Sequence, residues 1–262
     1  MTLQKEHVQG VACFGDKVKR LGTSIPVWVY AVDGLLVDTG PANLRSVLTP
    51  ILRDLQPKQA AVTHLHEDHC GLASWLQEEC QTDISLPTGS IPAARQQAKL
   101  PFYRRLFWGP RAPFEATPMP EELATPGGYR LQAIPTPGHM EEHVALFEPQ
   151  RGWLFSGDLY VRPRPKLGFI DERMGSMIQS LKKCVQLDVQ TLFCAHAGIV
   201  EQGGQALQSK LDYLLELRER KRELEKQGMG LKEIDRTLFP KKPLITYLSR
   251  GEWSSRHLLR TL

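Results

Sequence analysis

The sequence predicts an α/β fold, a layered αβ/βα sandwich in which helices cover the sheets. Strand-like apolar runs and helical periodicities are mixed over the first 205 residues. Residues 59–76 illustrate the order, because a short strand enters a His-rich loop and a helix follows directly. That connection suits a layered sandwich. The polar residues that can do chemistry follow predicted strands, and strand ends on a rigid scaffold commonly carry functional sites.

The elements predicted before the His-rich loop begin with a strand at residues 8–14. Two apolar runs within residues 26–38 flank Asp33-Gly34, which is a strong signal for a β-hairpin. Apolar residues recur with a helical period over residues 42–55 and predict a helix. After the loop, strands are predicted at residues 84–86, 129–134, 144–147, 152–158 and 189–193, with a helix at 177–187.

The composition restricts the class of protein. The 262 residues allow one large domain, or one domain with a small appendage. The apolar share of 41% and the charged share of 24% are ordinary for a soluble globular chain and exclude a disordered one. We expect neither a secretory signal nor a membrane span, because no apolar run is long enough. The five cysteines form no C-x-x-C pair, which favours reduced thiols and a cytoplasmic protein.

The C-terminal part differs from the rest in charge and pattern. Residues 207–262 hold 13 Lys and Arg against 8 Asp and Glu, and the net charge of the whole chain is +4. A basic tail can serve an anionic partner, but a solvated helical surface is the commoner explanation and is favoured here. A long helix to about residue 227 and short helices at 231–238, 243–249 and 253–261 are predicted. We therefore divide the chain into a catalytic domain, residues 1–205, and a helical C-terminal region, residues 206–262.

Residues 99–111 combine four aromatic and four cationic side chains with Pro and Gly in 13 positions. One interpretation is a lid that gives the substrate an apolar and cationic wall. The other is a surface connection whose aromatic side chains pack underneath. The sequence leaves both open.

Residues 64–69 place three imidazoles and two carboxylates in six consecutive positions. Burying such groups together is costly unless each finds a partner or a metal ion. Imidazole and carboxylate are common ligands of zinc and its neighbours in the first transition row. The alternative, a polar loop that happens to be rich in His, is less favoured because further ligand-type residues follow later strands.

The H-x-H-x-D-H pattern of His64, His66, Asp68 and His69 resembles the signature of the metallo-β-lactamase fold hydrolases. Four further motifs of that family occur in the family's order: Val37-Asp38-Thr39-Gly40, Thr136-Pro137-Gly138-His139, Phe155-Ser156-Gly157-Asp158 and Cys194-Ala195-His196-Ala197-Gly198. The resemblance covers roughly residues 10–205. It implies a four-layer αβ/βα sandwich, followed by a small helical region that forms a winged-helix-like cap in some relatives.

The resemblance also implies two divalent metal ions. One would take His64, His66 and His139, the other Asp68, His69 and His196, and Asp158 would bridge them. Zinc is expected, with iron and manganese open. Asp38 is expected to support the site, although it could simply form a turn before Gly40. His143 is predicted to support or pack rather than bind metal.

The expected chemistry is hydrolysis by a metal-bridging hydroxide. Such a hydroxide forms near neutral pH and attacks a carbonyl carbon or a phosphorus. Asp68 could pass a proton to the leaving group, and Tyr160 could donate a hydrogen bond to the reacting oxygen, unless Tyr160 only packs. The leading hypothesis is a small-molecule ester, thioester or lactone hydrolase, similar to the glyoxalase II and lactonase branches.

The alternatives are a phosphodiesterase or endoribonuclease of the same fold and a metal-binding scaffold without catalysis. The basic tail and the cations of residues 99–111 favour nucleic acid. The tail, however, shows no ordered stripe of cations interleaved with aromatic residues, so this alternative is not favoured. The sequence does not indicate an oligomeric state.

Overall fold

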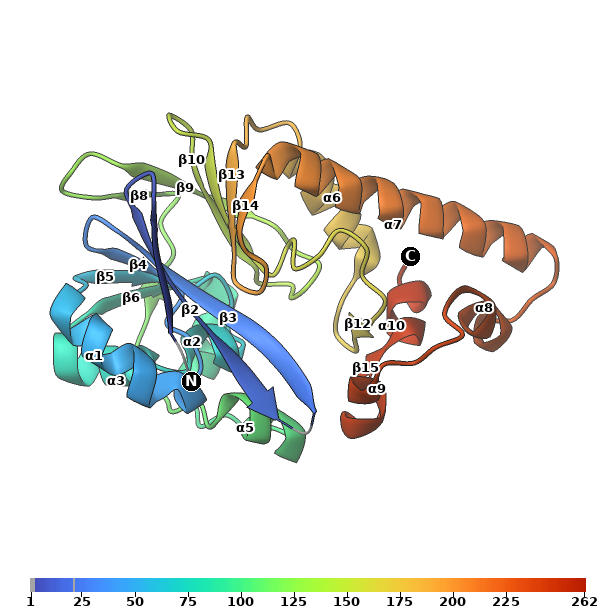
Figure 1. The fold of residues 1–262 in the computed structure, drawn as a ribbon, viewed down its shortest axis with the longest axis horizontal. Helices are drawn as coiled ribbons and strands as arrows, with labels where there is room; N and C mark the ends of the chain where they lie inside the picture. The colour runs from blue at the N-terminus through green and yellow to red at the C-terminus, as the bar shows by residue number, and fades with distance from the viewer. Residues whose placement is uncertain (1–2, 21) are drawn as a thin grey trace.

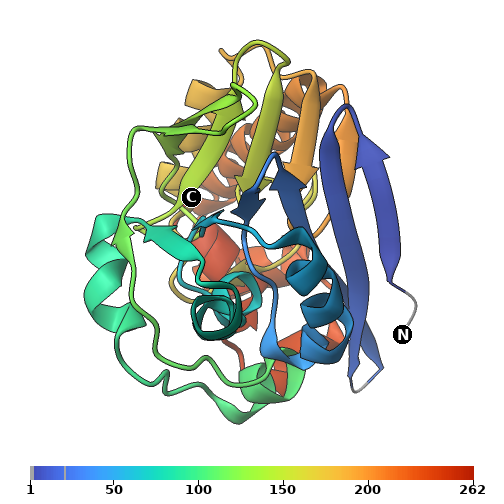
Figure 2. The same ribbon diagram turned by 90° about the vertical axis from the view of Figure 1, so that its left-hand side faces the viewer.

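The computed structural model describes residues 3–20 and 22–262. Two β-sheets face each other, and helices cover the outer face of each sheet (Figures 1 and 2). A long helix leaves the sandwich and leads to a cluster of short helices at the C-terminus. This arrangement is the αβ/βα sandwich predicted from the sequence.

The first sheet has seven strands in the order β1-β2-β3-β4-β5-β6-β7. Its first four strands pair antiparallel, and β4 to β7 are parallel. The parallel part matters for function, since the loops that leave the carboxyl ends of neighbouring parallel strands meet at one edge. The bounds are β1 Gln4–Val8, β2 Val11–Arg20, β3 Thr23–Val32, β4 Leu35–Val37, β5 Gln59–Ala61, β6 Asp83–Leu86 and β7 Thr117–Pro118.

The second sheet has six strands in the order β14-β13-β11-β10-β9-β8. Strands β11 and β13 are parallel, and the other pairs are antiparallel. The bounds are β8 Glu122–Ala124, β9 Arg130–Pro135, β10 Val144–Glu148, β11 Trp153–Gly157, β13 Thr191–Cys194 and β14 Gly198–Glu201. A separate pair joins β12 (Gly168–Phe169) to β15 (Trp253–Ser254).

Three apolar cores separate the layers. Side chains such as Tyr30, Phe155 and Phe193 fill the space between the two sheets. A second core lies between the first sheet and the helices α1 (Arg45–Leu55) and α3 (Ala73–Cys80). A third lies between the second sheet and the helices α6 (Met174–Cys184) and α7 (Gly203–Lys226). Two sheets and two helical layers confirm the four-layer prediction.

The remaining helices are short. They are η1 Ala42–Leu44, α2 Glu67–Cys70, η2 Thr88–Ser90, α4 Ile91–Ala94, α5 Phe102–Trp108, α8 Leu231–Leu238, α9 Leu244–Leu248 and α10 Ser255–Arg260. The last three confirm the short C-terminal helices. Helix α7 begins before residue 206 and packs on α6, so the division at 205/206 and the winged-helix-like comparison stay predictions. Within residues 3–20 and 22–262, none of the helices is long and apolar enough to cross a bilayer.

The N-terminal strand differs from the prediction. Residues 8–14 do not form one strand, because the chain turns at Gln9 and Gly10, which have φ angles of 53° and 100°. Strands β1 and β2 therefore form a hairpin with Val8 opposite Val11. A two-residue turn with positive φ at both positions matches the twist of a hairpin. The second predicted hairpin, with Asp33-Gly34 at its turn, is confirmed by the pairing of Val32 with Leu35.

Candidate metal centre

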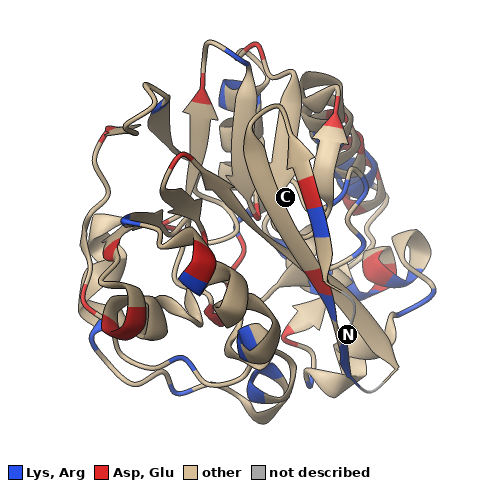
Figure 3. Ribbon diagram, turned by 60° about the vertical axis from the view of Figure 1, so that its left-hand side comes forward, with Lys and Arg blue, Asp and Glu red and all other residues tan. Residues whose placement is uncertain are grey.

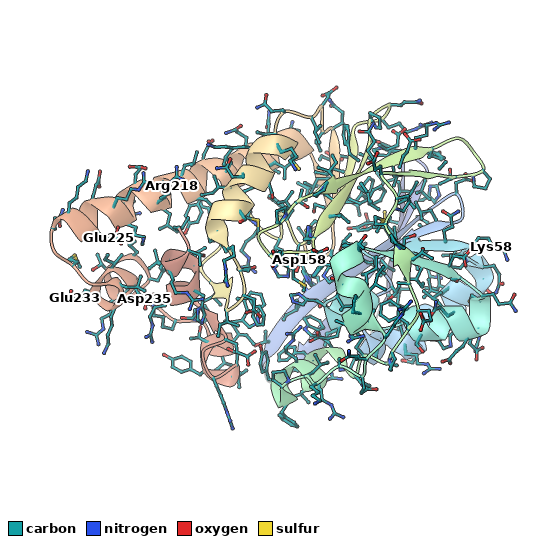
Figure 4. All side chains as sticks on the ribbon, turned by 180° about the vertical axis from the view of Figure 1, so that it is seen from behind. Lys58, Asp158, Arg218, Glu225, Glu233 and Asp235 are labelled. Atoms are coloured by element: carbon teal, nitrogen blue, oxygen red, sulfur yellow. The ribbon has the colours of Figure 1, made fainter. Side chains whose placement is uncertain are left out.

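The predicted ligands lie in the segments that follow strands, and Asp68 and His69 lie in the short helix α2. The loop of residues 62–66 leaves β5 and enters α2, with His66 in an extended conformation at the start of the helix. In the second sheet, His139 follows β9, Asp158 follows β11 and His196 follows β13. The two sheets thus bring their loops to one place, and Asp158 lies near the middle of the molecule (Figure 4).

Three histidine nitrogens form the first group. His66 Nδ1 lies 3.1 Å from His64 Nε2 and 2.9 Å from His139 Nε2. All three donor atoms lie within 4.8 Å of one another. Neutral imidazole carries one proton, so converging ring nitrogens can present lone pairs to a shared cation. The residues predicted to hold the first ion are brought together.

Asp68, His69 and His196 form the second group, again with donor atoms within 4.8 Å. His196 Nε2 lies 3.2 Å from Asp68 Oδ2, and His69 Nε2 lies 3.9 Å from the same oxygen. Two imidazoles and a carboxylate suit zinc, iron or manganese. The residues predicted for the second ion are brought together as well.

Asp158 lies between the two groups. Its Oδ2 is 3.2 Å from His139 Nε2, whereas its Oδ1 is 3.3 Å from His196 Nε2 and 3.5 Å from His69 Nε2. Both Asp158 Oδ1 and His69 Nε2 are buried without a hydrogen-bond partner. Buried polar atoms are normally satisfied. A metal ion would satisfy them, so the donor set fits two cations with a shared carboxylate.

The other nitrogen of three of these imidazoles has a hydrogen-bond partner. His69 Nδ1 lies 2.7 Å from Asp38 Oδ2, His139 Nδ1 lies 2.7 Å from Glu172 Oε1, and His196 Nδ1 lies 2.7 Å from the carbonyl oxygen of residue 26. Carboxylate and carbonyl oxygens accept hydrogen bonds, so each Nδ1 carries the hydrogen and each Nε2 presents its lone pair to the centre. These partners fix the rings in the orientation that a ligand needs.

Asp38 has further contacts that hold the His-rich loop. Its Oδ1 accepts hydrogen bonds from the backbone N–H of Thr63 at 2.8 Å and from the Thr63 hydroxyl at 3.0 Å. Asp38, which the sequence indicated as a supporting residue, contacts the candidate ligand His69, whereas Glu172 was not indicated. Glu172 lies in a loop without periodicity, 33 residues from the histidine it contacts, so no local spacing indicates it.

Burial and charge act differently on the two histidine groups. Burial, together with neighbouring imidazoles, holds the pKa of His64 and of His66 well below the usual value. Both are therefore neutral, as a ligand must be. Burial also opposes the charging of His69, but nearby carboxylates led by Asp38 and Asp158 outweigh it and raise the pKa of His69. In the second group, protons and a metal ion compete for the same nitrogen.

Tyr160 and His143 differ in how they relate to the site. Tyr160 is buried in the apolar core beneath α6 and α7, with side chains such as Met177, so its location does not favour the predicted catalytic role. His143 Nε2 accepts a hydrogen bond from the Asp158 N–H at 3.1 Å, and its Nδ1 lies 2.8 Å from the Thr136 hydroxyl oxygen. Both nitrogens of His143 are thus engaged, as the supporting role requires.

The segment 99–111 contributes α5, which lies beside the site. The Trp108 ring is 6.2 Å from the His196 ring. Phe107 is buried in the core of the first sheet, so aromatic side chains do pack underneath the segment. Arg111 is also buried and donates to backbone carbonyls, including that of Ala94 at 3.1 Å. Arg111 therefore does not contribute to the cationic wall of the lid interpretation.

Residues 23–196 match the family model of the metallo-beta-lactamase superfamily. This match covers more than half of the chain, and the chain belongs to that superfamily. The predicted family is thereby confirmed.

Named relatives agree with this assignment. The chain is 30% identical to a hydroxyacylglutathione hydrolase of Methylobacillus flagellatus over 65% of its own length and 61% of the relative's. It is 24% identical to a probable metallo-hydrolase, YqjP, of Bacillus subtilis over 82% of its own length and 81% of the relative's. A beta-lactamase domain protein from Burkholderia ambifaria has the same fold, with a TM-score of 0.70, 19% identity, and coverage of 97% of this chain and 87% of that one. The chain spans 61% of the first relative, and 56% of a beta-lactamase-like protein 2 homolog from Drosophila melanogaster.

Proposed function

We propose that the protein is a binuclear metal-dependent hydrolase that cleaves an ester, thioester or lactone of a small molecule. The observation that carries the proposal is Asp158, whose two carboxylate oxygens each face a separate group of ligand atoms. The similarity to a hydroxyacylglutathione hydrolase supports the ester-type substrate. Zinc is the proposed metal, and iron and manganese suit the same ligands.

The chain's own residues would hold the ions, orient the rings and move a proton. The proposed ligands are His64, His66, His139, Asp68, His69 and His196, with Asp158 shared. Bound there, two divalent ions would polarise the substrate's oxygen and lower the pKa of a water molecule towards about 7. Asp68 is almost fully buried at 6% exposure and would accept a proton from that water molecule and pass it to the leaving group.

The surroundings favour a small substrate over nucleic acid. Lys and Arg are interspersed with Asp and Glu along the elements visible in Figure 3. Of the arginines that favoured the nucleic-acid alternative, Arg104 is paired with Glu67, Arg111 is buried, and Arg105 is exposed. Binding to a phosphate backbone requires several free cations on one face. A reducing compartment such as the cytoplasm is proposed because all five cysteines are free and buried.

The test is a panel of a thioester, a lactone, a simple ester, a phosphodiester and a short RNA, applied to zinc-loaded protein. We expect turnover of at least one of the first three, its loss with a chelator, and its return with zinc. The Asp158→Ala variant should lose both turnover and metal. Cleavage of RNA without any turnover of the ester-type substrates would contradict the proposal and support the endoribonuclease alternative.

A further inference from the structure

Glu67 is a buried carboxylate inside the metal loop that the proposed chemistry does not use. It lies between His66 and Asp68, is 1% exposed, and belongs to neither ligand group. Its partner is Arg104 on α5, whose Nε donates to Glu67 Oε1 at 2.6 Å while Nη2 donates to Oε2. The two parallel hydrogen bonds of this fork fix both the distance and the orientation of the pair.

Arg104 also contacts the other side of the centre. Its guanidinium lies 5.3 Å from the centre of the Phe169 ring, and that ring lies edge-on to His66 at 5.8 Å. The Phe169 N–H donates to Glu172 Oε2 at 2.9 Å, and the other Glu172 oxygen holds His139. One arginine therefore touches the two segments that orient the first histidine group.

The pair is built for positioning rather than for binding an anion. The positive charge of Arg104 is matched by Glu67, and only 16% of the arginine side chain is exposed. A buried carboxylate that loses its partner is strongly unfavourable. Removal of Arg104 would therefore shift the first turn of α2, which also carries Asp68 and His69.

We propose that Arg104 is a positioning residue for the metal centre: through Glu67 and Phe169 it holds the metal loop and β12 in the geometry that binds the ions. The same contacts hold α5 against the site, so metal binding and the order of α5 are coupled, and the coupling is reciprocal. The inference rests on the metal site of the proposed function and not on its substrate.

The variants are Arg104→Gln, Arg104→Lys and Glu67→Gln, with Arg105→Gln as the matched control, because Arg105 is the exposed neighbour on the same helix. Zinc affinity is measured by competition with a chromophoric chelator. We expect Arg104→Gln and Glu67→Gln each to weaken zinc binding by about tenfold or more. Arg104→Lys should lose less zinc affinity than Arg104→Gln because it keeps the positive charge. It should not reach the wild-type affinity, because an ammonium group cannot form the fork. Arg105→Gln should bind zinc like the wild type.

Whether Arg104→Gln weakens or strengthens zinc binding distinguishes a positioning role from simple electrostatic repulsion. If the charge of Arg104 only repelled the ions, its removal would strengthen zinc binding, and that result would overturn the proposal. The double variant Glu67→Gln/Arg104→Gln should bind zinc about as weakly as either single variant, because each single change already breaks the pair. Additive losses would also overturn it.

Hydrogen exchange supplies a readout that does not depend on turnover. In the wild type, zinc should slow exchange of the amides of residues 99–111, and Arg104→Gln should abolish this protection.

Other outcomes distinguish the alternatives. If the Arg104→Gln variant binds zinc as tightly as the wild type but has a raised KM, Arg104 is a substrate contact and not a positioning residue. If Arg104→Gln does not fold, the near-isosteric Glu67→Gln carries the same test. A wild type that binds two zinc ions but hydrolyses nothing would refute the proposed function while leaving this inference standing.

Discussion

At the scale of single residues, the centre depends on groups that a motif does not contain. The seven proposed ligands belong to short motifs that the sequence shows, and the structure brings their ligand atoms together. Their supports come from remote positions, such as Glu172, which contacts His139, and the carbonyl at position 26, which lies 170 residues from His196. A backbone carbonyl has no sequence signature, and a lone loop carboxylate has no spacing rule. The sequence therefore indicated the candidate ligands and the supporting residues Asp38 and His143, but not Glu172 or the carbonyl at position 26.

Glu172 provides the first prediction at this scale. The change Glu172→Gln removes the charge that holds the Nδ1 hydrogen of His139, and we expect it to weaken zinc binding by about tenfold. Asp171→Asn is the control, because Asp171 is the exposed neighbour. Both are measured by chelator competition. Equal changes in the two variants would contradict a specific role for Glu172.

Lys210 provides a prediction about pH. Its Nζ is buried and donates to the carbonyls of Leu159 at 2.6 Å and Tyr160 at 2.8 Å, directly after Asp158. Burial lowers the pKa of Lys210 from 10.5 to about 8. Below that pH both the folded and the unfolded chain carry the proton. Above it the unfolded chain holds a proton that the folded chain lacks, so this lysine's contribution to the free energy of unfolding rises with pH.

The contribution of Lys210 to the free energy of unfolding should rise by about 3 kcal/mol as the pH approaches the pKa of the lysine in the unfolded chain. Lys210→Met lacks this contribution. Urea unfolding of the wild type and the variant, between about pH 7.5 and about pH 10, measures the effect. The difference between their free energies of unfolding should grow with pH. Parallel pH profiles would show that Lys210 does not change its protonation on folding.

At the scale of elements, segments with an apolar periodicity were predictable, and the shortest strands without one were not. The helices at 42–55, 177–187 and 231–238 have apolar faces that show in the sequence. The first two appear with shifted bounds, and the third appears with the predicted ones. The two-residue strands β12 and β15 are far apart in the chain, with Gly168 opposite Ser254 and Phe169 opposite Trp253, and such short elements carry no periodicity. Tertiary pairing, rather than local preference, determines them.

The backbone conformation at Gly138 positions the candidate ligand His139 after β9. Gly138 precedes His139 with a φ of 145°, and an added Cβ would meet backbone atoms of Met177 at 2.6 Å. We expect Gly138→Ala to lower the free energy of unfolding by about 2 kcal/mol or more and to reduce metal content. Gly128→Ala is the matched control, since its φ is also positive, at 90°, but nothing lies within 4 Å. It should cost about 1 kcal/mol and leave metal content unchanged. Similar losses in both would contradict the steric argument.

At the scale of the whole molecule, the centre joins the two sheets. The segment that follows β5 of the first sheet carries His64, His66, Asp68 and His69. The segments that follow strands of the second sheet carry His139, Asp158 and His196. Ions bound between them would stabilise the sandwich as a unit, because they bind only the folded chain. Removing metal with a chelator should therefore lower Tm by about 5 °C or more.

Calorimetry of zinc-loaded, chelated and reloaded protein measures this shift. The Asp158→Ala variant should show a much smaller difference between the loaded and chelated states. A Tm that does not change with zinc in the wild type would mean that the two sheets do not share the ions.

The most direct measurement is the number and position of bound ions in the wild-type protein, from elemental analysis of dialysed zinc-loaded samples combined with anomalous scattering from crystals. We predict two ions per chain, one at each histidine group, with Asp158 between them. Fewer than two tightly bound ions, or two ions with Asp158 bound to neither, would contradict the binuclear centre.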